Sequence, residues 1–338
     1  MALADSDGEE FELEYETQEV RLSDDDVYRV TTIANEALPL EMLLELEARR
    51  EEISGQRLWE GSLLLSDCLL RACRQRDVDV RGRSVLELGA GTGLAGMVAH
   101  RAGAAAVAVT DGDARCVLLM ERNLRENAVP PGAAIAAQLL WGDTRTEASL
   151  AATLAAQRGE SGEAWPCPPF DIILAGLVLS DKSTGPPQVL RSTWKYLAPA
   201  SPGGSYSSII LLPRSCVTAL RKFPPPHGPR SGDVLYKKGL VAPLLETARR
   251  LLARPAGVML LCHVPRAGVT HAIVELALDA VGLSFQASSP AVGAGGVGCE
   301  SQALAADGEG GAAAGVQVEV GGVVLDKEDV GRARLFRI

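Results

Sequence analysis

The fold of this 338-residue chain is decided by one stretch, Ser84-Val-Leu-Glu-Leu-Gly-Ala-Gly-Thr-Gly-Leu-Ala-Gly96. It begins as a short apolar run, reaches a cluster of glycines and continues into a helix-like run that ends at Ala102. A buried strand that stops at glycines before a helix is how a parallel α/β sheet brings its backbone close to a nucleotide. Glycine admits positive φ and has no Cβ to keep a ligand away. The stretch therefore predicts a ligand site at the carboxyl end of a strand.

Two classes of cofactor use such a turn. Gly91, Gly93 and Gly96 form G-x-G-x-x-G, and Asp111 follows about 20 residues later, as in dinucleotide-binding sheets. Glu87 favours the other class, because a carboxylate at the mouth of the turn would repel a pyrophosphate and attract the ammonium group of a methionine moiety. A glycine-rich turn that binds nothing is the third possibility.

The pattern Glu-x-Gly-x-Gly-x-Gly that starts at Glu87 resembles motif I of the S-adenosylmethionine-dependent methyltransferases. The resemblance implies S-adenosylmethionine as the cofactor, bound along Gly89, Ala90, Gly91 and Gly93. It also implies an α/β fold with a Rossmann-like, seven-stranded sheet that is mostly parallel and has an antiparallel C-terminal strand.

A second segment narrows the resemblance. Gly-x-x-Leu-Trp-Glu-Gly, residues 55–61, leads into an apolar helix before the motif I strand. This arrangement resembles the lysine-methyltransferase-like family, methyltransferase family 16. In that family the tryptophan lines the cofactor site, which implies this role for Trp59. The alternative is that Trp59 only packs the helix onto the sheet, as large aromatic side chains usually do.

The next two strands each end in a candidate site residue. Residues 106–111 form a strand that ends in Asp111, whose two oxygens suit the ribose hydroxyls. Asp113 is the better N-cap for the following helix, which leaves Asp111 free for a ligand. The third strand closes with Trp141-Gly142, and its Leu-x-Trp-Gly ending resembles the same family. The resemblance implies that Trp141 lies against the adenine.

The fourth strand, residues 170–176, ends in Gly176, which we expect at the cofactor site. The family continues this strand directly with Asp-x-x-Tyr, the pair that shapes the substrate entrance. Here the acid position holds Leu177 and the tyrosine position holds Ser180. The expected catalytic pair is therefore missing in register.

The pair is restored further along the chain by Asp233-Val-Leu-Tyr236. Residues 177–232 then form a probable insert, either a loop or a mis-annotated coding segment such as a retained intron. The resemblance implies that Asp233 and Tyr236 orient the acceptor nitrogen at the methyl group. A chance tetrad in a loop is the alternative.

The rest of the chain completes the predicted organisation. Residues 1–52 are expected to form an acidic tail with a strand and a helix, and residues 53–338 the methyltransferase domain. The domain is interrupted by the insert and by an Ala/Gly/Ser-rich loop at residues 287–315. A strand over residues 257–264, a hairpin over residues 316–325 and a terminal strand over residues 333–338 are also predicted.

Composition and charge restrict the class of partner. A net charge of −10 makes a nucleic-acid backbone an unfavourable partner. Neither the seven cysteines nor the four histidines show ligand spacing, so no metal is expected. No run approaches the length of a membrane span and the first residues do not form a signal peptide, so we expect a monomeric, reduced protein with no membrane partner. We expect it in the cytoplasm, with the nucleus as a further location.

Three functions follow from these observations. The leading one is a protein-lysine N-methyltransferase, whose substrate protein rests on the resemblance alone. The second is a methyltransferase-like binding protein that is impaired because the insert displaces Asp233. The third is an NAD-dependent oxidoreductase that uses the overlapping G-x-G-x-x-G, although the sequence offers no acid or base for a hydride site.

Overall fold

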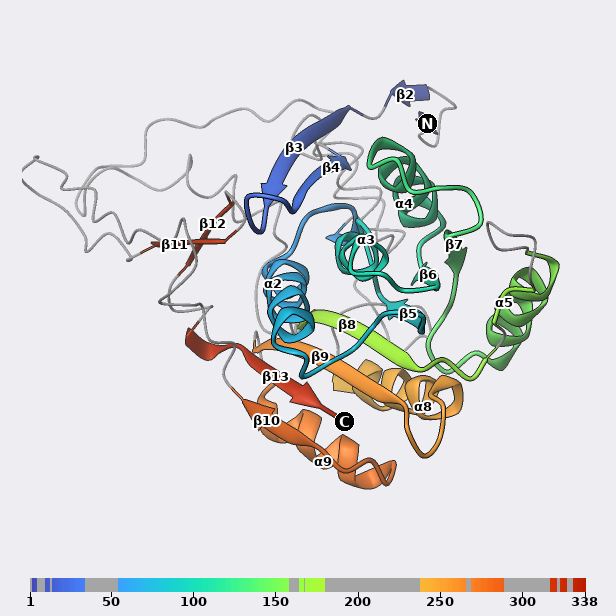
Figure 1. Ribbon diagram of the computed structural model, residues 1–338, viewed down its shortest axis with the longest axis vertical. Helices are drawn as coiled ribbons and strands as arrows, with labels where there is room; N and C mark the ends of the chain where they lie inside the picture. Colours follow the sequence, from blue (N-terminus) through green and yellow to red (C-terminus); the bar gives the residue numbers. More distant parts are fainter. Residues whose placement is uncertain are drawn as a thin grey trace, which may run out of the picture. The chain divides into compact units, whose positions relative to one another are not determined.

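We describe the fold from a computed structural model of the chain (Figure 1). The structure describes residues 2–4, 10–12, 14–33, 54–157, 164–166, 168–179, 238–265, 269–288, 317–320, 323–326 and 331–338. The chain divides into two compact units. One comprises residues 1–14, 34–52 and 182–235, and the other comprises residues 15–33, 53–181 and 236–338. Everything below except the short pair β1 (Ala2–Ala4) and β2 (Glu10–Glu12) concerns the second unit.

The second unit is built on a seven-stranded sheet with the order β10-β13-β9-β8-β5-β6-β7. Its strands are β5 (Ser84–Leu88), β6 (Ala106–Asp111), β7 (Ala134–Gln138), β8 (Ile172–Leu179), β9 (Val258–Pro265), β10 (Gln286–Ser288) and β13 (Arg334–Arg337). The five strands from β5 to β9 pair in parallel, whereas β13 is antiparallel to both its neighbours. The predicted mostly parallel sheet with an antiparallel C-terminal strand is confirmed.

Helices cover both faces of this sheet, as Figure 1 shows. On one face lie α2 (Glu60–Gln75), α3 (Leu94–Arg101) and α4 (Ala114–Glu126). On the other lie α5 (Thr144–Ala156), α8 (Val241–Leu251) and α9 (His271–Ala280). In β5, Val85 joins the first core and Leu86 the second. A strand buried on both faces has to be apolar throughout, which explains the continuous apolar run of the sequence.

The strand order also places the site. The chain runs from β5 outward to β6 and β7, and then returns to the other side of β5 to form β8 and β9. The order of the strands therefore reverses between β5 and β8. In open α/β sheets ligands bind at such a reversal, outside the carboxyl ends of the strands. The glycine turn follows β5 at this point.

Part of the predicted acidic tail is a folded hairpin. β3 (Tyr15–Arg21) pairs antiparallel with β4 (Val27–Ile33), and Val20 and Tyr28 are buried in the core of the first face. The acid run at residues 24–26 contributes to the turn of this hairpin, and Asp26 forms an ion pair with Arg74 of α2 at 2.8 Å. The charges therefore mark a turn here, where the sequence predicts a solvated tail.

Strand β8 continues beyond the predicted insertion point. Its residues 177–179 stay paired with β9, with Leu177 opposite His263 and Leu179 opposite Pro265. The remaining residues of the expected insert lie outside the described part of the chain, as does the helix expected within residues 1–52. Of the loop expected over residues 287–315, residues 287 and 288 belong to β10 and the rest also lies outside the described part. The hairpin predicted near the C-terminus is confirmed as β11 (Gln317–Val320) and β12 (Val323–Asp326).

Cys262 and His263 of β9 are both buried, as expected of packing residues. His263 Nδ1 lies 3.0 Å from Nδ1 of His271, whose Nε2 donates to the carbonyl of Arg332 at 2.8 Å. Burial, and secondarily His271, lowers the pKa of His263 to about 4, so this pair is neutral at physiological pH. In the described ranges, no helix has both the length and the apolar character that crossing a membrane requires.

Candidate cofactor site at the glycine turn

Three glycines with positive φ shape the turn after β5. Gly89, Gly91 and Gly93 have φ values of 65°, 54° and 79°. Gly93 is the N-cap of α3, which begins at Leu94. Residues with a Cβ rarely adopt this conformation, so the spacing of the glycines is dictated by the backbone of the turn. The predicted strand, turn and helix are confirmed.

The protein itself uses three amides of this turn. The amide of Ala90 donates to the carbonyl of Thr110 at 2.9 Å, and that of Gly93 donates to the carbonyl of Ala90 at 2.9 Å. The amide of Gly91 donates to Oδ2 of Asp111 at 3.0 Å. A turn that cradles a pyrophosphate presents its amides to the anion. These three amides are not available for that purpose, which disfavours a dinucleotide.

Glu87 lies beneath the turn, where the sequence argument placed it at the mouth. Its side chain is 2% exposed, and Oε2 accepts a hydrogen bond of 2.7 Å from the amide of Gly96 in the first turn of α3. Burial, with a smaller effect of Asp111, raises the pKa of Glu87 to about 8. The carboxylate is therefore buried beneath the turn, and its predicted attraction of an ammonium group stays a prediction. Glu87 fixes the helix that follows the glycines, and direct contact with the cofactor stays a prediction.

Asp111 lies beside the turn at the end of β6. Its Oδ2 accepts from Gly91, and its Oδ1 accepts from the amide of Asp113 at 3.0 Å. Each carboxylate oxygen has two lone pairs, so each retains one for a ligand. Asp113 caps α4 as predicted, by accepting from the amide of Arg115 at 2.8 Å. Asp111 is thus already bonded to the turn, but it keeps the capacity to bind two ribose hydroxyls.

The segment before α2 lies directly against the glycine turn. A Cβ placed on Gly91 would come within 2.5 Å of the carbonyl oxygen of Gly55. Gly55 itself has no room for a side chain, because its Cβ would lie 2.9 Å from Sγ of Cys116. The half-buried Trp59 packs against the core of the first face, and its carbonyl accepts from the amides of Ser62 and Leu63. The structure thus gives Trp59 a packing role and leaves its predicted cofactor contact untested.

Gly176 in β8 is where α2 approaches the sheet. A Cβ at this position would lie 2.9 Å from backbone atoms of Gly61 and Ser62. Gly176 therefore serves the packing of α2, and its role at the cofactor stays a prediction. The Ser62 side chain is 8% exposed, and its hydroxyl has no hydrogen-bond partner among the described residues.

Trp141 covers the other side of the turn. Its indole lies against Gly89, where a Cβ would come within 2.7 Å of Cζ2. The backbone is held on both sides of this ring: the amide of Leu140 donates to Oγ1 of Thr146 at 3.1 Å, and that of Gly142 donates to Oγ1 of Thr247 at 2.8 Å. Trp141 therefore lies beside the glycine turn, and its predicted contact with the adenine stays a prediction.

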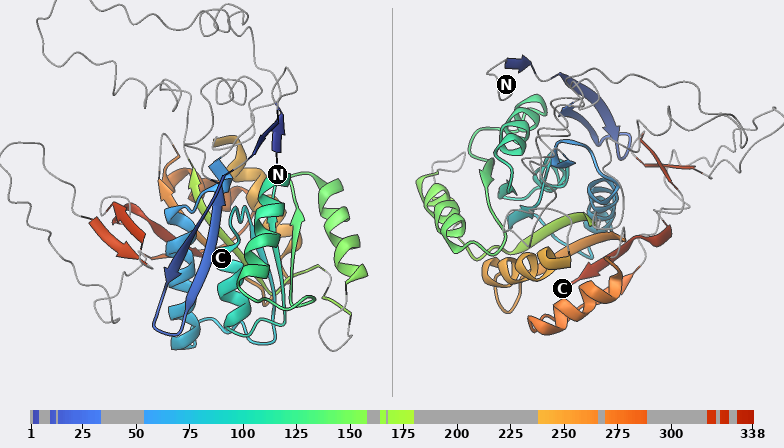
Figure 2. Two further views of the ribbon diagram at one scale, coloured as in Figure 1. Left: turned by 90° about the horizontal axis from the view of Figure 1, so that it is seen from above. Right: turned by 180° about the vertical axis from the view of Figure 1, so that it is seen from behind.

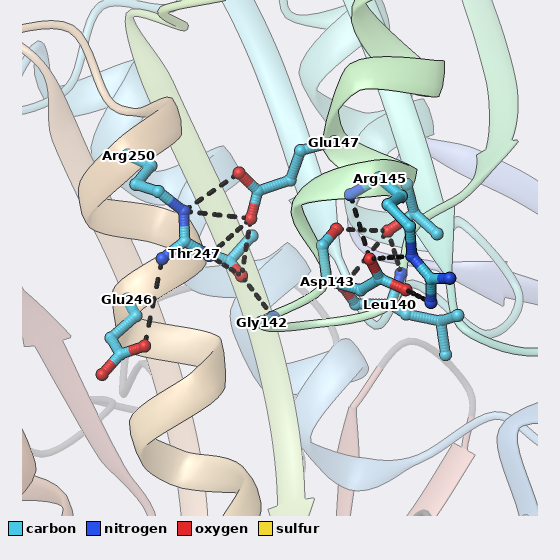
Figure 3. Close-up of polar contacts among 9 residues, drawn as sticks. Leu140, Gly142, Asp143, Arg145, Glu147, Glu246, Thr247 and Arg250 are labelled. Atoms are coloured by element: carbon cyan, nitrogen blue, oxygen red, sulfur yellow. Dashed lines mark hydrogen bonds and ion pairs between the residues drawn. The ribbon is translucent and has the colours of Figure 1, made fainter.

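A polar network on α5 and α8 holds Thr247 in place (Figure 3). Figure 3 shows the carboxylate of Glu147 between Arg250 and Thr247. Arg250 donates to Glu147 through Nε at 3.0 Å, and the Thr247 hydroxyl lies 3.3 Å from Oε1 of Glu147. Thr247 and Glu147 are both buried. The network connects α8, which follows Asp233 and Tyr236 in the chain, to the loop that carries Trp141.

Replacing Thr247 with valine tests this support. Valine has nearly the shape of threonine but leaves the Gly142 amide without its acceptor, so the Trp141 loop loosens. We expect the Kd for S-adenosylhomocysteine to rise roughly fivefold. Isothermal calorimetry measures it. Thr153→Val is the matched control, because the Thr153 hydroxyl is on the exposed side of α5 and, among the residues described, bonds to the carbonyl of Ser149 alone. Equal Kd values for the two variants would contradict the prediction.

The residues present fit S-adenosylmethionine. Asp111 has lone pairs for the ribose, Trp141 offers an apolar ring, and Ser62 has a buried hydroxyl to pair. Asp233 and Tyr236, the predicted catalytic pair, lie outside the described residues, and their roles stay predictions. Across the ranges that the structure describes, no group of three His, Cys, Asp or Glu residues is placed to hold a metal ion.

Sequence reasoning missed two residues of the site. Gly55 acts through its carbonyl, which no side-chain pattern marks, although it is the first residue of the quoted Gly-x-x-Leu-Trp-Glu-Gly segment. Thr247 is a polar residue on the apolar face of α8, and this mismatch was the available signal.

Known proteins match this chain in part. Residues 40–155 match the lysine methyltransferase family. EEF1A lysine methyltransferase 3 of Mus musculus is 36% identical over 86 residues, which cover 25% of this chain and 34% of the relative. The chain thus spans about a third of the length of this curated relative.

Two solved structures are among those to which the chain is similar in part. A proposed methyltransferase crystallised with S-adenosylhomocysteine has a TM-score of 0.43 and 12% identity, over 95% of this chain and 55% of that one. The ribosomal protein L11 methylase of Lactobacillus delbrueckii subsp. bulgaricus has a TM-score of 0.33 and 14% identity, over 65% and 68% of the two chains. The segment that matches the lysine methyltransferase family includes the glycine turn, Asp111 and Trp141.

Proposed function

We propose that the chain is an S-adenosylmethionine-dependent methyltransferase that modifies a lysine side chain of a protein. The observation that carries the proposal is the Asp111 carboxylate. It holds the amide of Gly91, keeps two lone pairs beside the turn, and lies within the segment that matches the lysine methyltransferase family. An acid in this position suits the ribose hydroxyls of an adenosyl group.

Methyl transfer mainly requires the protein to align the methyl donor with the acceptor amine. When bound, S-adenosylmethionine supplies an electrophilic methyl group on a sulfonium. Asp111 and Trp141 would fix its adenosyl end, and the buried Ser62 hydroxyl would pair with a polar group near β8. The lysine amine must be neutral to attack, and its proton leaves to water. A nearby Asp raises the pKa of a lysine, so we assign Asp233 and Tyr236 to capture and orientation of the amine.

The net charge of the chain and the bonding of the turn amides support the choice of substrate class. A net charge of −10 favours approach of a basic, lysine-bearing segment over a nucleic acid. The overlapping G-x-G-x-x-G does not favour a dinucleotide, because three of the turn amides are bonded within the protein. We propose that the protein acts as a monomer in the cytoplasm, with the nucleus as a second location.

Two measurements test the function. Calorimetry should show binding of S-adenosylhomocysteine and no binding of NAD. The full chain should transfer label from methyl-labelled S-adenosylmethionine to protein in a cell extract, and hydrolysis of that protein should yield methylated lysine. Binding of NAD alone would support the oxidoreductase. Binding of S-adenosylhomocysteine without transfer to any extract would support the impaired methyltransferase-like binding protein.

A further inference from the structure

Asn123 links the N-terminal hairpin to the glycine turn. It is fully buried in α4, on the helix face that also carries Cys116, Leu119 and Met120. Its Oδ1 accepts from the amide of Thr31 at 2.8 Å, and its Nδ2 donates to the carbonyl of Thr31 at 3.0 Å. Nδ2 also donates to the carbonyl of Thr92 at 2.9 Å. One side chain thus binds strand β4 and the turn together.

The bond to Thr92 fixes a peptide in the middle of the turn. The carbonyl of Thr92 and the amide of Gly93 belong to the same planar peptide group. Asn123 holds the carbonyl, and the carbonyl of Ala90 holds the amide at 2.9 Å. Because the peptide is held at both ends, it cannot rotate. This fixes the positive φ of Gly93 and the start of α3.

A second asparagine provides a natural comparison. One helical turn later, Asn127 binds the same strand in the same way: Oδ1 accepts from the amide of Arg29 at 2.8 Å, and Nδ2 donates to its carbonyl at 2.6 Å. Apart from Arg29, the described contacts of Asn127 are within α4, to the carbonyl of Asn123. Figure 2 shows the hairpin running alongside α4. The two side chains therefore bind β4 with the same pattern of hydrogen bonds, buried at Asn123 and exposed at Asn127, and of the two Asn123 also bonds to the turn.

We propose that Asn123 is a positioning residue that couples the hairpin β3–β4 to the cofactor turn, so that hairpin order and cofactor binding stabilise each other. The proposal rests on the proposed cofactor site. The hairpin precedes residues 40–155, the segment that matches the family, so the match gives no reason to include it in the site. Coupling of this kind is reciprocal: if an ordered hairpin strengthens cofactor binding by a given free energy, cofactor binding stabilises the ordered hairpin by the same free energy.

Amide hydrogen exchange in the wild-type chain, followed by NMR with S-adenosylhomocysteine as the probe, tests the coupling. Binding should slow exchange of the Thr31 amide at least about threefold more than that of the Arg29 amide, because the Asn123 contact alone leads to the turn. The Arg29 amide is an internal control on the same strand. Equal effects on the two amides, or none, would overturn the inference.

A matched pair of variants tests the same coupling by removing each asparagine contact and measuring the effect on cofactor affinity. Asn123→Leu and Asn127→Leu each replace an amide with an apolar group of similar shape and no charge. We expect the Kd for S-adenosylhomocysteine to rise about tenfold in Asn123→Leu, which leaves the Thr92 carbonyl unpaired, and to stay within about twofold in Asn127→Leu. Both variants should loosen the hairpin. A similar Kd for both would make Asn123 merely structural and overturn the inference.

The outcomes separate this inference from the proposed function. If Asn123→Leu does not fold, the exchange measurement on the wild-type chain decides alone. If the wild-type chain binds no S-adenosylhomocysteine, the proposed function and this inference both fail. If it binds while Thr31 exchange is unchanged, only the inference fails.

Discussion

Gly91→Ala is expected to weaken binding of S-adenosylhomocysteine by at least about a hundredfold. The new Cβ would lie 2.5 Å from the carbonyl oxygen of Gly55, a backbone atom that cannot rotate away. Either residues 54–56 move off the turn and no longer cover the site, or the turn itself shifts and the Gly91 amide leaves Oδ2 of Asp111. Calorimetry measures the loss of affinity.

Gly82→Ala is the matched control for this substitution. Gly82 also has a positive φ, of 67°, but a Cβ there would meet nothing within 4 Å. Its substitution is expected to cost about 1 kcal/mol of stability through backbone strain and to leave the Kd unchanged. Affinity in Gly91→Ala that equals that of Gly82→Ala would show that the contact with Gly55 does not shape the site.

Asp111→Asn is the second change with a large expected effect. The amide side chain has a single oxygen, so it cannot accept from Gly91 and Asp113 together and still serve a ribose hydroxyl. We expect affinity for S-adenosylhomocysteine to fall about a hundredfold, since hydrogen bonds to a charged group are the stronger ones. Asp79→Asn, a change of an exposed carboxylate, is the control.

The pH dependence of binding gives an independent test of whether the ionised Asp111 carboxylate contacts the ligand. Burial raises its pKa to about 6, against the opposing effect of the amides of Asp113 and Gly91. Ribose hydroxyls donate to the ionised form, so the affinity of the wild-type chain should be constant above that pH. Below the pKa of Asp111 the affinity should decrease, and the decrease should approach about tenfold for each pH unit. Asp111→Asn should lack this decline. A wild-type Kd that is independent of pH would exclude direct contact with Asp111.

Local signals in the sequence were sufficient for the sheet and for much of the turn. The apolar run before Gly89 predicted β5, and the position of Asp113 before an amphipathic helix predicted its capping of α4. The resemblance singled out Trp141 as a cofactor residue, and the structure shows its indole against Gly89. Each of these depends on neighbours within a few residues or on a motif that spans one element.

Contacts between distant segments could not be predicted in the same way. The position of Gly55 against Gly91 depends on how α2 packs, and the N-terminal hairpin is held by side chains of α4. Glu87 is different, because the alternation along a strand already places it on the same face as Val85, toward α3. The argument from charge did not use that periodicity, and it therefore did not predict how deeply the carboxylate is buried.

The hydrogen bonds of Asn123 and Asn127 to strand β4 also affect how the protein behaves in concentrated solution. A strand edge with free amides and carbonyls can recruit a strand of another molecule and start aggregation. Asn123 and Asn127 occupy those groups at Thr31 and Arg29. The partner strand β3 carries exposed charged residues at Glu16, Glu19 and Arg21. The hairpin is therefore a poor template for further strands, although it lies outside the sheet that carries the site.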